Sequence, residues 1–201
     1  MGVVMEELTF LRRLLAISGA GLAYAQDKFD QERYQSVRDL AEDQMAAYTG
    51  QPVSSIRANF ADEQGYPTPK VDVRAFIRRD KQFLMVENDH GEWALPGGFA
   101  EVGWSLKANV AKEVKEETGL TVDVGRLRAV FDTSQRTDIP QAFQYYKMIF
   151  ECEIKSGSFV QNSETVATGW FEQSALPPLS LSRTTPEQVA ILFSKQPTYI
   201  E

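Results

Sequence analysis

Three glutamates are spaced so that one face of a helix would bring their carboxylates together. Glu113, Glu116 and Glu117 stand at i, i+3 and i+4, and side chains at these spacings are neighbours on a helix surface. Their like charges repel, so the arrangement favours a cation, and Mg²⁺ prefers carboxylate oxygens and bridges them to substrate phosphates. The spacing predicts a Mg²⁺ site, with Mn²⁺ as the other candidate metal. A solvated acidic face of a surface helix gives the same pattern.

The residues around these glutamates have the signals of a helix that follows a glycine-rich loop. Ser105 suits the N-cap position and Gly119 the left-handed position that ends a helix, so we predict a helix over residues 107–117. Gly97 and Gly98 precede it, and adjacent glycines let the backbone come close to a metal or a phosphate. The loop and the helix together favour a metal and phosphate site over a plain surface helix.

Gly98 and the run from Lys112 to Leu120 resemble the Nudix box, whose pattern is Gly-x5-Glu-x7-Arg-Glu-(apolar)-x-Glu-Glu-x-Gly-(apolar). Trp104 stands where the family has a glutamate, and Lys112 stands where it has an arginine. In the family these two residues support the metal-binding carboxylates, so the departures bear on rate and metal geometry. The resemblance implies an α/β/α sandwich with a mixed sheet. It also implies metal-dependent hydrolysis of a nucleoside diphosphate linked to another group.

The resemblance assigns roles to individual residues of this sequence. Glu113 and Glu117 would be the primary Mg²⁺ ligands, and Glu116 would be a third ligand or the base that orients the attacking water. The backbone ligand of the family falls at the carbonyl of Gly97. Glu164, in a polar loop late in the chain, is the candidate for a further acidic catalytic group, with a solvated loop residue as the other interpretation.

Four residues are candidates for contacts with the substrate. Arg74 offers a rigid fork of donors to a phosphate, or it forms a structural ion pair with Asp72 or Glu87. Glu87 is also kept as a candidate at the substrate site. Phe99 and Trp104 could stack on a base or on a quaternary ammonium through their π faces, or could pack in the ordinary way.

The N-terminal helical segment, taken with Trp104 and Lys112, resembles a subgroup of Nudix enzymes that act on CDP-choline or ADP-ribose. We expect CDP-choline as the substrate, giving CMP and phosphocholine, because an aromatic residue beside the site would suit a choline group. The alternatives are an ADP-ribose or nucleotide-sugar pyrophosphatase and a Nudix module that binds its ligand without turnover. The N-terminal helices would form a homodimer interface or cover the substrate.

The composition is that of a soluble globular protein, with 43% hydrophobic and 24% charged residues in a chain of 201. A net charge of -7 argues against nucleic-acid binding. One histidine and one cysteine leave no internal disulfide and no multi-histidine zinc site within the chain. No apolar run approaches the ~20 residues of a membrane span. Residues 12–25 imitate a signal peptide, but we interpret them as part of a mature helix and expect a cytoplasmic protein without membrane partners.

The spacing of apolar residues changes from a helical pattern to a strand pattern near residues 65–70, where two prolines and a glycine enforce an extended chain. This change separates the elements of the chain into two groups. We predict an all-α N-terminal domain over residues 1–66 and a Nudix α/β domain over residues 67–201. The expected helices cover 6–25, a segment from a cap at Asp30 to Gly50, a short segment from Ser54 or Ser55, and one opened by Thr185 and Pro186. The expected strands cover 71–77, 82–87, 122–131, 145–154 and 166–171, with residues 93–95 leading into the glycine loop and a polar loop over 132–144.

Overall fold

The chain forms two compact units, each described here by itself. The computed structural model describes residues 2–61, 63, 65–136 and 139–201, with the backbone alone for residues 2–6. One unit comprises Met1–Pro69 and Thr133–Tyr145, and the other comprises Lys70–Asp132 and Tyr146–Glu201. The first unit therefore includes a loop that is distant from its helices in the sequence.

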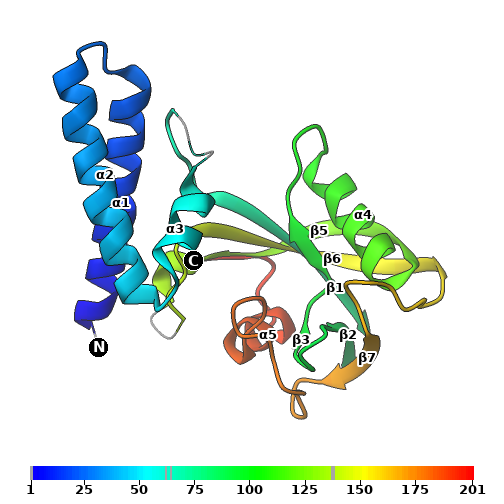
Figure 1. Ribbon diagram of the computed structural model, residues 1–201. Helices are drawn as coiled ribbons and strands as arrows, with labels where there is room; N and C mark the ends of the chain where they lie inside the picture. Colours follow the sequence, from blue (N-terminus) through cyan, green and yellow to red (C-terminus); the bar gives the residue numbers. More distant parts are fainter. Residues whose placement is uncertain (1, 62, 64, 137–138) are drawn as a thin grey trace. The chain divides into compact units, whose positions relative to one another are not determined.

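The first unit is built on three helices, α1 (Gly2–Tyr24), α2 (Lys28–Thr49) and α3 (Val53–Phe60), and α1 and α2 form a hairpin (Figure 1). The N-terminal helical region predicted from the sequence is confirmed. Apolar residues at helical spacing on these elements share one core. Its buried members are Leu8, Leu11, Leu15, Ala41, Met45, Ala46, Ile56, Phe60 and Ala142.

Local chemistry explains how the two long helices begin and pack. The N-cap of α2 is Asp27, whose Oδ1 accepts a hydrogen bond from the N–H of Phe29 at 2.7 Å. The prediction of Asp30 as the cap was wrong, because Asp30 already lies in the first turn. Gly21 lets α1 approach α2, since a Cβ at this position would lie 2.3 Å from a ring carbon of Tyr34.

The second unit is a mixed eight-stranded sheet with the order β3-β2-β1-β6-β5-β8, in which β4 pairs with β1 and β7 pairs with β2. The pairing of β5 with β8 is parallel, and β1 pairs antiparallel with β2 and β4. The strands and helices of this unit are β1 (Lys70–Arg79), β2 (Gln82–Glu87), β3 (Trp93–Ala94), β4 (Gly97–Phe99), α4 (Leu106–Thr118), β5 (Leu120–Asp132), β6 (Tyr145–Gly157), β7 (Ala167–Glu172), α5 (Pro186–Phe193) and β8 (Tyr199–Ile200).

Each face of the sheet is covered by one helix, because successive strand residues point to opposite faces. Val73 of β1 packs in one buried cluster with Val110 of α4. Phe76 of the same strand packs in a second cluster with Leu192 of α5. In Figure 1 the strands of this unit accordingly pass between α4 and α5. The mixed-sheet α/β architecture predicted from the sequence is confirmed.

The helix ends of this unit match their sequence signals. Ser105 caps α4 by accepting a hydrogen bond from the N–H of Ala108 at 3.3 Å, and Gly119 ends the helix in the left-handed region with φ of 71°. Thr185 and Gln188 form a reciprocal capping box at the start of α5. The helix that carries the glutamates therefore has both ends fixed by local chemistry.

Candidate active site

Two glycines let strand β4 lie directly against its neighbours. Gly97 has a φ of 137°, and a Cβ there would lie 2.1 Å from the carbonyl oxygen of Val73 on β1, so a glycine is required. At Gly98 a Cβ would lie 2.5 Å from Oε2 of Glu113. The backbone of β4 thus meets β1 at one residue and a carboxylate of α4 at the next.

Glu117 is held at both carboxylate oxygens. Its Oε2 accepts a hydrogen bond from the N–H of Gly97 at 2.7 Å, and its Oε1 accepts one from Nη2 of Arg183 at 3.0 Å. Burial raises the pKa of Glu117, and the positive charges of Arg74 and Arg183 and the bond from Gly97 oppose that rise. These contacts fix the carboxylate against the glycine strand.

Glu113 lies one turn before Glu117 and carries a negative charge that is poorly compensated. Burial raises the pKa of Glu113 most, and the neighbouring charges of Glu117 and Glu116 raise it further. The charge of Lys112 opposes these effects, with its Nζ 3.9 Å from Oε1 of Glu113. A carboxylate in this environment faces the bare backbone of Gly98 and is suited to bind a divalent cation. The positive charge of that cation would neutralise the negative charge of Glu113.

Lys112 connects the outer carboxylates of the loop and the helix. Its Nζ lies 2.7 Å from Oε2 of Glu116 and 3.1 Å from Oε1 of Glu101, and these hydrogen bonds raise the pKa of Lys112 above its ordinary value. Glu116 is 55% exposed and points to this lysine. Within the described ranges, no three His, Cys, Asp or Glu side chains gather closely enough to hold a metal ion. The ligand roles of Glu113, Glu116, Glu117 and Gly97 stay predictions.

A buried network of charges lies on β1 and β6. Nη2 of Arg74 lies 2.9 Å from Oδ1 of Asp72, so of the two acidic partners considered from the sequence the ion pair is formed with Asp72. Lys147, whose side chain is 2% exposed, lies 3.7 Å from Oδ2 of Asp72 and donates to the carbonyl of Ser182 at 3.2 Å. The charge of Arg74 still reaches Glu117, where it opposes the effect of burial on the pKa.

The loop that carries Glu164 is anchored at the C-terminal end of α4. Nδ2 of Asn162 donates to the carbonyl oxygens of Glu116 at 2.9 Å and Glu117 at 3.2 Å, and its Oδ1 accepts from the N–H of Glu164. The last carbonyls of a helix lack partners within it, and Asn162 satisfies two of them. This anchor supports Glu164 as a catalytic candidate, which stays a prediction.

The other predicted substrate contacts lie at different places on the second unit. Phe99 at the end of β4 is 60% exposed and Trp104 is 52% exposed, so both rings present surface on which a base could stack. Glu87 ends β2, opposite Trp93 of β3. The structure therefore places Phe99 directly after the two glycines on β4, and Glu87 on β2 in a different strand pair.

Sequence reasoning missed four polar residues that build this site: Arg183, Lys147, Asn162 and Asn109. Asn109 is 1% exposed, and it donates to the carbonyl of Phe99 at 3.2 Å and accepts from the N–H of Glu101 at 3.0 Å. The position of Asn109 beside the apolar stripe of the helix was a signal that the sequence offered. Arg183, Lys147 and Asn162 had no such signal, because their partners are far away in the sequence.

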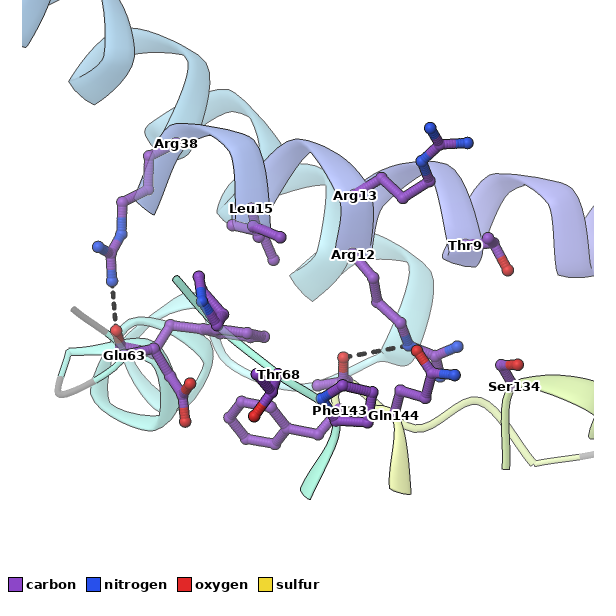
Figure 2. Close-up of a pocket in the computed structure, with 15 residues that line it drawn as sticks. Thr9, Arg12, Arg13, Leu15, Arg38, Glu63, Thr68, Ser134, Phe143 and Gln144 are labelled. Carbon is purple, nitrogen blue, oxygen red and sulfur yellow. Dashed lines mark hydrogen bonds between the residues drawn. The ribbon is translucent and has the colours of Figure 1, made fainter. Parts of the chain in front are cut away.

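A separate cavity of about 290 Å³ lies in the helical unit (Figure 2). Arg12 reaches from α1 over its edge to donate to the carbonyl of Ala142 at 3.3 Å, and the rings of Phe60 and Phe143 lie 4.4 Å apart in its wall. Residues 142 and 143 are thus held to the helices by a charged donor and by ring packing. All the lining residues belong to the first unit, whereas Glu113, Glu116 and Glu117 of α4 belong to the second.

The sequence matches two family models. Residues 6–60 match the model described as "UDP-X-like, N-terminal oligomerisation domain", and residues 68–191 match the NUDIX domain. The putative ADP-ribose pyrophosphatase YjhB of Bacillus subtilis (strain 168) is 42% identical over 183 residues, which are 90% of this chain and 88% of that protein.

Two solved structures are similar over large parts of the chain. The crystal structure of a UDP-X diphosphatase is 35% identical with a TM-score of 0.65, covering 98% of this chain and 99% of that one. The crystal structure of an ADP-ribose pyrophosphatase from Streptococcus suis 89-1591 is 40% identical with a TM-score of 0.60, covering 67% of this chain and 100% of that one.

Proposed function

Since this chain belongs to the Nudix family and is a pyrophosphohydrolase, we propose that it hydrolyses the diphosphate bond of ADP-ribose, giving AMP and ribose 5-phosphate. The relatives that match most of both chains are named for ADP-ribose and for UDP-X. Our expectation of CDP-choline is not supported by these names, and the alternative expectation of ADP-ribose takes its place. A UDP-linked compound is the second candidate, because the UDP-X diphosphatase is similar along nearly the whole chain.

The observation that carries the chemistry is the seating of two α4 carboxylates against the glycine strand. Glu117 accepts a hydrogen bond from the N–H of Gly97, and Oε2 of Glu113 would lie 2.5 Å from a Cβ added at Gly98. A divalent cation held by these two carboxylates and the Gly97 carbonyl would neutralise the charge of a bound diphosphate. Mg²⁺ is the metal we propose, with Mn²⁺ as the substitute.

The side chains around the pair support the reaction in distinct ways. Arg183 is placed to offer guanidinium donors to a phosphate once a cation takes over its role at Glu117. Lys112 keeps Glu116 and Glu101 in place, which is the support that the arginine of the family pattern implies. Glu164, on the loop anchored by Asn162, is the proposed group for accepting the proton of the attacking water. Phe99 and Trp104 offer rings for the adenine base.

The test is product analysis with the full chain and three substrates: ADP-ribose, UDP-glucose and CDP-choline. Each is incubated with Mg²⁺, with Mn²⁺ and with a chelator, and nucleotides are separated by ion-exchange chromatography. We expect metal-dependent release of AMP, with kcat/KM for ADP-ribose at least about tenfold above that for CDP-choline. Faster cleavage of CDP-choline would overturn the substrate, and faster cleavage of UDP-glucose would favour the second candidate.

Two variants separate the site from the rest of the chain. Glu117→Gln removes the negative charge of the carboxylate that accepts hydrogen bonds from Gly97 and Arg183. We expect the kcat/KM of this variant to fall by about a hundredfold or more. Glu153→Gln is the control, because this glutamate is 84% exposed on β6. Equal activity in the two variants would contradict the assigned site.

A further inference from the structure

Asp72 on β1 pairs with two buried cations that come from different strands. Nη2 of Arg74 lies 2.9 Å from Oδ1 of Asp72, and Nζ of Lys147 on β6 lies 3.7 Å from Oδ2. The three residues are at most 5% exposed, and we call them the ion-pair network. Apolar residues of similar volume often stabilise a core at least as well as a buried ion pair does. Stability alone is therefore a weak explanation of the network.

Each cation of the ion-pair network also binds a backbone carbonyl on a segment that leads to the candidate site. Nη1 of Arg74 donates to the carbonyl oxygen of Leu95 at 3.2 Å, two residues before Gly97. Nζ of Lys147 donates to the carbonyl oxygen of Arg183. Hydrogen bonds from a charged donor are roughly twice as strong as neutral ones. Both segments are thus fixed at these carbonyls.

These two segments supply the donors to both carboxylate oxygens of Glu117. The N–H of Gly97 donates to Oε2 at 2.7 Å, and Nη2 of Arg183 donates to Oε1 at 3.0 Å. The segments are also joined to each other, because the N–H of Leu95 donates to Oγ1 of Thr184 at 2.9 Å. Contacts therefore run from the ion-pair network to each oxygen of Glu117.

We propose that Asp72 is a positioning residue, which sets Glu117 and its donors in place for the metal and the diphosphate. It acts through its two cations, and it contacts neither the metal nor the substrate. Arg74 belongs to the branch that ends at Oε2, and Lys147 belongs to the branch that ends at Oε1. This role rests on the proposed function, because Glu117 binds the metal only if that function is correct.

Hydrogen exchange measured by NMR tests the branch through Arg74 without metal or substrate. In Asp72→Asn kept in chelator, we expect the amide of Gly97 to exchange at least about tenfold faster, because its acceptor is no longer held in place. The amide of Val189, which donates to Thr185 at 3.1 Å at the start of α5, should change by less than about threefold. Equal acceleration of both amides would show a general loss of stability and would overturn the proposal.

Two further variants make the exchange result specific. Asp123→Asn is the matched control, because Asp123 on β5 is 68% exposed and lies 3.4 Å from Lys155, so neither amide should respond. Asp72→Asn leaves its two cations buried without that carboxylate, which can be strongly destabilising. The double variant of Asp72→Asn with Lys147→Met removes one charge of each sign, so the same two amides are compared in a core whose charge is balanced.

A double-mutant cycle in KM tests the branch through Lys147, with the substrate that the wild type cleaves fastest. We expect Lys147→Met to raise KM by about threefold to tenfold with kcat changed by less than about twofold. When Arg183→Met is already present, the same change should alter KM by less than about twofold. Effects that multiply in the double variant would overturn the positioning role, since independent sites are additive in free energy. Lys155→Met, on the same strand and 55% exposed, is the control.

These outcomes separate the positioning role from the proposed function. A wild type that cleaves none of the diphosphate substrates, or a Glu117→Gln variant that keeps full activity, overturns the proposed function, whereas the exchange of Gly97 does not depend on turnover. Unchanged exchange of Gly97 in Asp72→Asn, with a wild type that cleaves ADP-ribose, overturns the positioning role alone.

Discussion

Nη2 of Arg183 lies 3.0 Å from Oε1 of Glu117, although 66 residues separate the two in the chain. Burial lowers the pKa of Arg183, the nearby charge of Arg74 lowers it further, and Glu117 acts in the opposite direction. The guanidinium therefore occupies a carboxylate oxygen that we propose as a metal ligand. Its departure from that oxygen would free its donors for the diphosphate.

Replacing Arg183 separates these two roles. We expect Arg183→Met to bind Mn²⁺ about threefold to tenfold more tightly, because a competing cation has left Glu117, and to raise KM for ADP-ribose by about tenfold or more. Calorimetric metal titration and steady-state kinetics measure the two effects. Arg126→Met is the control, since Arg126 forms an exposed pair with Glu151 at 2.7 Å. Weaker metal binding in Arg183→Met would contradict the competition.

The two glycines of β4 should respond differently to alanine. Gly97→Ala places a Cβ against the backbone oxygen of Val73 at a φ of 137°, so we expect a loss of more than about 2 kcal/mol in the free energy of unfolding. Gly98→Ala meets only the end of the Glu113 side chain, so activity should fall with a smaller change in stability. Gly103→Ala, with φ of 90° and open space, measures backbone strain alone. Denaturant unfolding and kcat/KM distinguish the three, and equal stability in Gly97→Ala and Gly103→Ala would refute the steric argument.

The raised pKa of Glu113 sets the sign of a pH dependence in the metal-free protein. A carboxyl whose folded-state pKa is raised contributes stability below its unfolded pKa of about 4.3 and loses it as pH rises through the folded value. We expect Glu113→Gln to match the wild type in Tm below the unfolded-state pKa, to exceed it increasingly as pH rises through the folded-state pKa, and to keep a constant advantage above it. Differential scanning calorimetry in chelator provides the difference curve. Adding Mg²⁺ at neutral pH should raise the Tm of the wild type more than that of the variant.

Cys152 should be inert in the folded state. Burial, with the nearby charges of Asp123 and Glu151, raises the pKa of its thiol to about 12, so almost no thiolate is present at pH 8. We expect Ellman's reagent to modify the native chain at least about a hundredfold more slowly than the chain unfolded in guanidinium. Leu40→Cys serves as the exposed reference thiol, because Leu40 on α2 is 69% exposed. Comparable rates for native and unfolded wild type would show that the strand opens far more readily than its packing indicates.

The sequence by itself determined the local elements and the residues that carry charge. The caps at Ser105 and Thr185 and the stop at Gly119 are local preferences of backbone and side chain, so helices α4 and α5 could be predicted. The same holds for the spacing of Glu113, Glu116 and Glu117, because a helix fixes which side chains share a face. The alternation of strands with two helices along the chain in turn indicated a mixed sheet with helices on its faces.

Only the tertiary structure decided which groups meet across long stretches of chain. Asn162 and Arg183 reach α4 from segments at least 45 residues further along the chain, and Lys147 on β6 reaches Asp72 on β1. No local pattern specifies such contacts. The choice of Asp72 over Glu87 as the partner of Arg74 is of the same kind, since it depends on side chains sharing one buried space. Local propensity fixes an element, whereas packing in three dimensions fixes its neighbours.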